Sequence, residues 1–201
     1  MSPKRIFDAS ISFLLICLLL PVFFSISVWI WLDSDGKIFY AQVRIGKRKQ
    51  PFYVLKFRTM REGSDQKGLL TVGDRDFRIT RAGYWLRKYK VDELPQLFNI
   101  LLGKMSFVGP RPEVSKYVAL YDRQQQRVFS VKPGLTDWAS IQLMNESELL
   151  ANAADPENFY RTTLIPMKIQ LALKYIDHQS LWTDLNIIID TLKCILRSLP
   201  Q

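Results

Sequence analysis

Asp92 and Glu93 form an adjacent pair of carboxylates at the predicted start of a helix. A helix N-terminus has free N–H groups and a partial positive charge, which keep such side chains ionised and can help to hold a phosphate. Two carboxylates without histidine or thiolate neighbours also suit a hard, oxygen-seeking cation. Capping of the helix is the structural alternative, because Asp and Glu are ordinary residues of a first turn.

Basic residues stand close to the acidic pair on both sides. Arg87, Lys88 and Lys90 precede it, and Arg111 follows it within Gly109-Pro110-Arg111-Pro112. Two prolines restrict the backbone around Arg111, and its planar guanidinium suits bidentate binding of a phosphate. The alternative is a rigid loop whose arginine pairs with a carboxylate.

A third basic group lies in Lys56-Phe57-Arg58-Thr59-Met60, at the end of a predicted strand. Side chains of a strand alternate between two faces, so Lys56 and Arg58 would share one face. This face is either a solvated edge or a second contact to phosphate. The predicted phosphate-binding residues are Lys56, Arg58, Arg87 and Arg111.

Two helices are expected next to these residues. Asp92 to Leu102 has the apolar i, i+3, i+4, i+7 spacing of a helix, with Pro95 in its first turn. Thr80 to Tyr89 is the second predicted helix, with Thr80 as its N-cap.

Strands, a turn and a further helix are expected in the rest of the chain. Apolar runs at Ile38 to Ala41 and Phe52 to Leu55 predict two strands, and the turn-forming residues 46–51 between them predict a hairpin. Lys132-Pro133-Gly134 has the residue order of a type II turn. Leu181 to Leu196 has an apolar stripe that predicts a helix packed on the core, with a helix in the membrane interface as the alternative.

The N-terminal segment from Ala9 to Leu32 holds 24 residues without a charge. A straight helix of this length would span roughly 36 Å, which is enough to cross a bilayer. Pro21 stands near its middle, and basic residues flank both ends, which favours the cytoplasm for both flanks. The segment is therefore either a re-entrant helix that breaks at Pro21 or one spanning helix with a proline kink.

Composition narrows the partners and excludes several kinds of site. The 201 residues include 28 Lys and Arg against 19 Asp and Glu, and the net charge of +9 implies an anionic partner. A single histidine, His178, leaves no basis for a histidine triad or a zinc site, and two cysteines form no disulfide framework. Common phosphate-loop motifs are missing, and the basic residues do not form one long run with interleaved aromatic residues, so nucleic acid is not an expected partner.

Three blocks of the sequence together resemble the monotopic bacterial phosphoglycosyl transferases, the bacterial sugar transferases that act on polyprenyl phosphate. The blocks occur in one order and at close spacing: Lys56-Phe57-Arg58-Thr59-Met60, Asp92-Glu93-Leu94-Pro95-Gln96-Leu97-Phe98-Asn99 and Gly109-Pro110-Arg111-Pro112. The resemblance runs from about Lys4 to about Leu196, and the length is similar to that of the small, single-domain members. Leu20-Pro21 is a departure, because many members have Ser-Pro there.

The resemblance implies transfer of a phospho-sugar from a nucleotide sugar, expected to be a UDP-sugar, to polyprenyl (undecaprenyl) phosphate, with release of UMP. It implies Mg²⁺ at an Asp-Glu dyad, in which Asp92 would be the nucleophile and Glu93 would bind the metal or assist. Lys56, Arg87 and Arg111 match basic positions expected near the phosphates. Such a reaction would be the first membrane step of glycoconjugate assembly, and downstream glycosyltransferases become candidate partners.

The expected architecture is mainly α with a small β-hairpin, in the α+β class. Residues 1–32 would form a re-entrant helix-break-helix anchor that breaks at Pro21. Residues 33–201 would form one catalytic domain at the cytoplasmic face of the bacterial inner membrane. Anionic lipids are expected partners of the basic chain, and the sequence leaves open whether several copies assemble.

Two other functions stay open as alternatives. A lipid-phosphate hydrolase could use Asp92 as an aspartyl nucleophile, with water as the acceptor. A basic membrane scaffold would bind lipid without any turnover. The close association of the Asp92 block with the Arg111 block counts against the scaffold.

Overall fold

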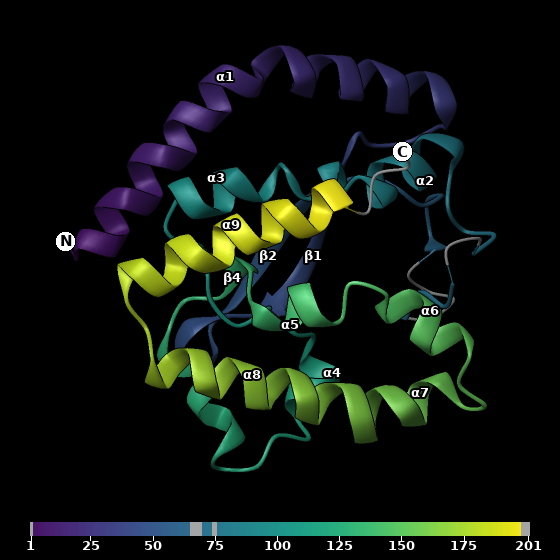
Figure 1. Cartoon of the computed structure of the whole chain (residues 1–201). Helices are drawn as coiled ribbons and strands as arrows, with labels where there is room; N and C mark the ends of the chain where they lie inside the picture. The colour runs from purple at the N-terminus through teal and green to yellow at the C-terminus, as the bar shows by residue number, and fades with distance from the viewer. Residues whose placement is uncertain (1, 65–69, 74–75, 198–201) are drawn as a thin grey trace.

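The computed structural model describes residues 2–64, 70–73 and 76–197 of the chain. This part is mostly helical and contains two small two-stranded sheets, in agreement with the expected α+β class (Figure 1). It begins with α1 (Pro3–Asp33) and ends with α9 (Leu181–Arg197). The elements between them are, in chain order, β1 (Phe39–Ile45), η1 (Lys47–Lys49), β2 (Pro51–Phe57), α2 (Arg81–Lys88), η3 (Val91–Glu93), α3 (Gln96–Leu101), β3 (Ser106–Val108), α4 (Ser115–Val118), η4 (Gln125–Ser130), β4 (Gly134–Thr136), α5 (Trp138–Gln142), α6 (Glu146–Ala151), α7 (Pro156–Phe159), η5 (Tyr160–Leu164) and α8 (Ile165–Asp177).

The predicted hairpin and the predicted helix after Thr80 are both confirmed. β1 and β2 pair antiparallel, and the last pair before the turn joins Ile45 to Pro51. The Thr80 side chain accepts a hydrogen bond from the N–H of Gly83 at 2.9 Å and so caps α2. These elements carry Lys56 on β2 and Arg87 on α2.

The acidic pair lies outside the helix in which it was expected. Asp92 and Glu93 belong to the short 3-10 helix η3, and α3 begins only at Gln96. Pro95 has no N–H to donate to Val91, so the α-helical bond that would join the acidic pair to the predicted helix is missing. A 3-10 bond from the preceding N–H to the Val91 carbonyl, at 3.2 Å, forms instead.

The predicted type II turn at Lys132-Pro133-Gly134 is wrong. Gly134 begins β4, which pairs parallel with β3, and it does not have the positive φ that such a turn requires. A Cβ on Gly134 would lie 2.2 Å from the backbone nitrogen of Gly109. Glycine is needed here for the close approach of two backbones.

α1 differs from the expected helix-break-helix, because it is one helix that stays continuous through Pro21. A proline removes a single N–H bond and bends a helix without ending it when packing supports both sides. Pro21 is exposed, while Ile16 on one side and Phe23, Ile26 and Ile30 on the other are buried. The bend therefore lets both halves of α1 pack on the rest of the molecule, and Figure 1 shows α1 as an arch over α3.

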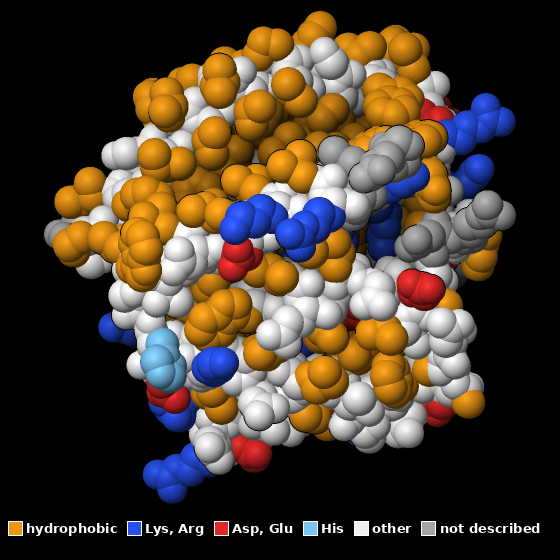
Figure 2. All heavy atoms as spheres, viewed as in Figure 1, with side chains coloured by type: hydrophobic (Ala, Val, Ile, Leu, Met, Phe, Trp, Pro, Cys, Tyr) orange, Lys and Arg blue, Asp and Glu red, His pale blue; other side chains and the backbone are white. Residues whose placement is uncertain are grey.

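The outer face of α1 is apolar and exposed. Figure 2 shows hydrophobic side chains gathered over this helix, with a hollow beneath it. Among the described residues, α1 is the helix long and apolar enough to cross a membrane, by length and composition alone. Large apolar side chains that point away from the molecule include Phe13, Leu14, Leu18, Phe24, Trp31 and Leu32.

The apolar stripe of α9 is mostly exposed, which corrects the prediction that it packs on the core. The inner side of this helix presents Asp184 and Ile187, both nearly fully buried. Asp184 accepts hydrogen bonds from the Tyr175 hydroxyl at 2.6 Å and from Lys4, and this polar contact sets the rotation of the helix. The exposed apolar side chains of α9 are Leu181, Trp182, Leu185, Ile189, Leu192 and Leu196.

Candidate active site

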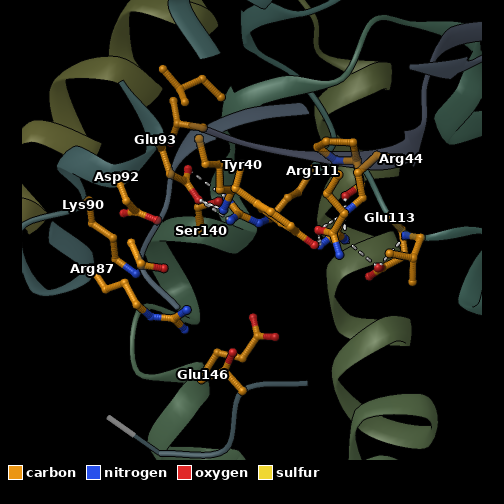
Figure 3. Close-up of a pocket in the computed structure, with 18 of the residues that line it drawn as sticks. Tyr40, Arg44, Arg87, Lys90, Asp92, Glu93, Arg111, Glu113, Ser140 and Glu146 are labelled. Carbon is orange, nitrogen blue, oxygen red and sulfur yellow. Dashed lines mark hydrogen bonds and ion pairs between the residues drawn. The ribbon is translucent and has the colours of Figure 1, made fainter. Parts of the chain in front are cut away.

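Asp92 and Glu93 lie on the wall of a cavity of about 1210 Å³ (Figure 3). The hairpin, the loop after β3, and helices α5, α6 and α8 supply other parts of the wall. Ligand pockets commonly have volumes of about 300–1,000 Å³. This cavity therefore has room for a ligand with more than one chemical part.

Glu93 is held by two basic side chains from distant parts of the sequence. Its Oε1 accepts hydrogen bonds from Lys56 Nζ at 2.7 Å and from Arg111 Nη2 at 2.6 Å. Burial by itself would raise the pKa of Glu93, but the charges of Arg111 and Lys56 outweigh it and hold this pKa below its usual range. Glu93 is therefore a fixed anion that orients Lys56 and Arg111.

Asp92 has a different environment from its neighbour. Its side chain is almost fully buried, and its carboxylate has no hydrogen bond or ion pair with any residue that the structure describes. Burial raises the pKa of Asp92; the charge of Lys56 opposes this shift, and the charge of Glu93 adds to it. The two carboxylates thus differ in acidity, which is typical of pairs with two separate roles.

Basic side chains outnumber the carboxylates at this end of the cavity. Arg87 and Lys90 lie beside Asp92, whereas Arg111 lies beside Glu93 (Figure 3). Burial, together with the charge of Arg111, lowers the pKa of Lys90. The excess of positive charge suits a polyanionic ligand.

Arg111 is positioned by a loop that lies between β3 and β4. The Gly109 N–H donates to a β4 carbonyl at 3.2 Å, and the Pro110 carbonyl accepts from the first N–H of β4 at 3.0 Å. The N–H of Arg111 itself lies 3.3 Å from Asp137 Oδ2. The guanidinium pairs with Glu93, as the sequence-based alternative proposed, and its side chain is 41% exposed because it faces the cavity.

Arg58 is the predicted phosphate-binding residue that the structure does not bring to the acidic pair. β2 ends at Phe57, so the two-residue alternation that would place Arg58 beside Lys56 stops there. The Arg58 guanidinium donates to the carbonyls of Ser34 and Asp35, each at 2.6 Å. Arg58 therefore binds the backbone just after the C-terminal end of α1, whereas Lys56, Arg87 and Arg111 surround Asp92 and Glu93.

One family profile, described as bacterial sugar transferase, matches residues 1–198. The chain belongs to the bacterial sugar transferase family. The match covers α1, the acidic pair and the Arg111 loop, as the resemblance of the three sequence blocks indicated.

Curated sugar transferases resemble this chain over nearly its whole length. It is 36% identical to UDP-N-acetylgalactosamine-undecaprenyl-phosphate N-acetylgalactosaminephosphotransferase of Aeromonas hydrophila, over 96% of this chain and 43% of the relative. It is 38% identical to the uncharacterized sugar transferase EpsL of Bacillus subtilis, over 97% of this chain and 88% of the relative. It is 33% identical to UDP-glucose:undecaprenyl-phosphate glucose-1-phosphate transferase of Escherichia coli, over 92% of this chain and 38% of the relative. The chain thus spans less than half of the Aeromonas and Escherichia relatives and most of EpsL.

The cavity of this family member has a second polar network, which no sequence pattern had indicated. The network crosses the wall formed by β1, α6 and α8, and its six members come from five separate places in the chain. No local motif marks them, although Glu113 directly follows the Arg111 loop. The linked residues are Gln42, Arg44, Glu113, Tyr160, Lys168 and Glu146.

Asp92 fits a ligand for a divalent cation better than Glu93 does. Within residues 2–64, 70–73 and 76–197, no group of three or more His, Cys, Asp or Glu side chains converges as a complete metal site. Mg²⁺ is usually bound by one or two carboxylates and completed by water and substrate phosphates. The Asp92 carboxylate is not engaged by a described residue, whereas Glu93 Oε1 already accepts two hydrogen bonds.

Proposed function

We propose that this chain transfers a sugar phosphate from a UDP-sugar to polyprenyl (undecaprenyl) phosphate and releases UMP. The observation that carries the proposal is the buried Asp92 next to Glu93 in a cavity with excess positive charge. The names of the Aeromonas and Escherichia relatives describe this class of reaction, and both relatives match more than nine tenths of this chain. Such a reaction begins the assembly of a lipid-linked glycan.

Asp92 is the nucleophile in the proposed mechanism. Its carboxylate attacks the phosphorus that carries the sugar, the bond from that phosphorus to the bridging oxygen breaks, and UMP leaves with the bonding electrons. A phosphate oxygen of polyprenyl phosphate then attacks the same phosphorus, and Asp92 departs as a carboxylate. The absence of a described hydrogen-bond partner for Asp92 supports this role, because the attacking oxygen is not already engaged.

The basic side chains neutralise phosphate charge in this mechanism. Phosphoryl transfer depends mainly on positioning and on electrostatic stabilisation. Arg87 and Lys90, which flank Asp92, offset the repulsion between its carboxylate and the incoming diphosphate. Lys56 and Arg111, oriented by Glu93, face the same space and suit the phosphate oxygens.

Mg²⁺ is the proposed cofactor. Asp92 would hold it, with Glu93 as a second carboxylate nearby, and the substrate phosphates would complete its coordination. When bound, the cation would supply charge neutralisation at the diphosphate. The protein's own contribution is a buried carboxylate whose environment excludes most water.

The same globular body holds both ends of α1, which supports a re-entrant anchor. At its start, Lys4 donates to Asp184, and Arg5 donates to the carbonyls of Ile100 and Leu101, each at 2.6 Å. At its end, Asp33 accepts from the N–H of Ala82 at 2.9 Å. A helix that crossed the bilayer would carry its two ends to opposite sides, so these contacts favour entry and return on one side.

The proposed location is the cytoplasmic face of the bacterial inner membrane. The bend at Pro21 would lie deepest in the bilayer, because the residues around it are exposed and apolar. α9 also presents exposed apolar side chains, together with Trp182 and Lys193, and suits the membrane interface. Residues 33–201 would then form the catalytic domain at the lipid surface, where polyprenyl phosphate resides.

Cysteine labelling tests this topology. Ser2→Cys and Lys37→Cys, each in a background without Cys17 and Cys194, are expected to resist an impermeant maleimide in intact cells and to react after permeabilisation. Lys37 is preferred to Gly36, because a side chain on Gly36 would lie 2.3 Å from Arg58 Nη1. Labelling of position 2 from outside the cell would establish a single spanning helix instead.

Turnover by the purified protein tests the proposed activity. With a UDP-sugar and polyprenyl phosphate we expect UMP release and a lipid-linked diphosphate sugar, and loss of both products after EDTA treatment. A lipid-phosphate hydrolase would instead release phosphate from the lipid without any nucleotide sugar. A membrane scaffold would bind lipid vesicles and give no product with any of a panel of UDP-sugars.

A further inference from the structure

We propose that the cavity wall formed by α6 and α8 is the subsite for the sugar ring of the donor, with Glu146 and Lys168 as its polar contacts. This inference rests on the proposed function, because it assumes a nucleotide sugar in the cavity. It adds the residues that would recognise the sugar and set the choice among sugars. Neither residue belongs to the three blocks that identified the family.

Glu146 and Lys168 present paired hydrogen-bonding groups to the cavity. Glu146 Oε1 accepts from Lys168 Nζ at 2.7 Å, and the two side chains keep 30% and 17% of their exposure. In the described part of the chain, no residue hydrogen-bonds to Glu146 Oε2. A carboxylate that can accept, beside an ammonium that can donate, matches neighbouring hydroxyl groups, each of which is both donor and acceptor.

Glu146 lies within electrostatic reach of the phosphate end of the cavity. Figure 3 shows its carboxylate facing the space bordered by Arg87 and Arg111. The pKa of Arg111 is raised mainly by Glu93 and, more weakly, by the charges of Asp137 and Glu146. A sugar attached to the phosphate bound at Arg111 would therefore project into the region that Glu146 borders.

Tyr160 and Glu113 connect this wall to the Arg111 loop. Lys168 Nζ lies 4.6 Å from the centre of the Tyr160 ring and 3.4 Å from its hydroxyl. That hydroxyl donates to Glu113 Oε2, while Glu113 Oε1 accepts from Arg44 at 2.9 Å. Lys168, one of the proposed sugar contacts, is thus linked through Tyr160 to Glu113, the residue that follows Pro112.

The local backbone and the apolar lining of the cavity also suit a sugar ring that carries hydroxyl groups. Tyr160 begins a π-helical turn, η5, and such turns are frequent at functional sites. Burial, and then the charge of Glu113, raise the pKa of Tyr160, so its hydroxyl stays a hydrogen-bond donor. Leu143, Ile165 and Ile169 also line the cavity and can contact the C–H faces of a sugar.

Binding measurements with UDP and with UDP-sugars test the proposal. Glu146→Gln keeps the shape of the side chain and an oxygen that can accept from Lys168, so we expect it to fold. It is expected to raise the Kd of the preferred UDP-sugar about tenfold, since a hydrogen bond to a charged group is lost, and to leave the Kd of UDP unchanged. Lys168→Met should give the same selective loss, and both variants should change the order of preference among epimeric UDP-sugars.

Glu157→Gln is the matched control. Glu157 also pairs with a lysine, Lys116, and with the hydroxyl of Tyr117, but it does not line the cavity. This variant should bind both ligands as the unmodified protein does. An equal loss of UDP and UDP-sugar in Glu146→Gln would assign the wall to the nucleoside or to the fold, and unchanged binding of both would overturn the subsite. Failure of the unmodified protein to bind any UDP-sugar would instead overturn the proposed function.

Discussion

Asp92→Asn is expected to abolish turnover, by about 10³-fold or more, while the fold and membrane association persist. Asparagine has nearly the shape of aspartate but no anionic oxygen, so it cannot form the acyl phosphate. Unlike Glu93, Asp92 holds no described side chain in place through a hydrogen bond, so its replacement leaves the ion pairs of Lys56 and Arg111 intact. UMP release and membrane flotation, measured on the same preparation, check both halves of this expectation.

The difference in stability between Asp92→Asn and the unmodified protein should depend on pH in a defined direction. Burial raises the pKa of Asp92 above the value in the unfolded chain, about 3.9 for an aspartate. Between these two pKa values the folded state of the unmodified protein binds more protons than the unfolded chain does. Its free energy of unfolding therefore falls as pH rises between the two pKa values, and this loss of stability persists at neutral pH. In buffer without divalent cations, we expect the Tm of Asp92→Asn to equal or exceed that of the unmodified protein at pH 8, and to match it near pH 4. A lower Tm of the variant at pH 8 would contradict the buried, unpartnered state of Asp92.

Mass spectrometry of the intact protein can detect the covalent intermediate. Incubation with UDP-sugar alone should add the mass of one phospho-sugar, which maps to Asp92, and should release UMP before lipid is present. Ping-pong kinetics should accompany the adduct. Turnover that strictly requires both substrates together, without a trapped adduct, would favour direct transfer and leave Asp92 as a metal ligand.

Arg111→Lys is expected to lower kcat/KM by roughly 10- to 100-fold, although the charge is kept. The guanidinium reaches Glu93 with one nitrogen at 2.6 Å and another at 3.5 Å, and it faces the cavity from a rigid loop. Lysine loses this planar fork, and a hydrogen bond to a charged group contributes about 1.5–3 kcal/mol. Steady-state kinetics with the preferred UDP-sugar measure the loss.

Arg127→Lys is the matched control for Arg111→Lys. Arg127 pairs with Asp177, and both side chains are about half exposed on the surface, where such pairs contribute little. We expect this variant to have unmodified kinetics. Wild-type efficiency in Arg111→Lys would show that the Gly109 to Pro112 loop has only a structural role.

Local sequence patterns predicted the elements whose signals lie within a few residues. The hairpin between β1 and β2 follows from two apolar runs around a turn, and the start of α2 follows from the Thr80 cap. The pattern failed at the acidic pair, because the missing N–H at Pro95 outweighed the favourable apolar spacing and α3 starts only after this proline. It also failed at Gly134, where a contact with Gly109, distant in sequence, decides the backbone conformation.

The family, the positive charge and the acidic pair with its nearby basic residues could all be read from the amino-acid sequence, because they depend on residue type and on short spacings. Which basic residues meet at the pair depends on how distant segments fold together: Lys56 and Arg111 converge on Glu93, whereas Arg58 binds at the end of α1. The solvent exposure of the apolar stripe of α9 also depends on the tertiary structure, since contacts of Asp184 with distant residues set the rotation of that helix. Local sequence patterns could not predict the pairing of Glu146 with Lys168 in the cavity wall, because these residues are brought together by the packing of helices that are separated in the chain.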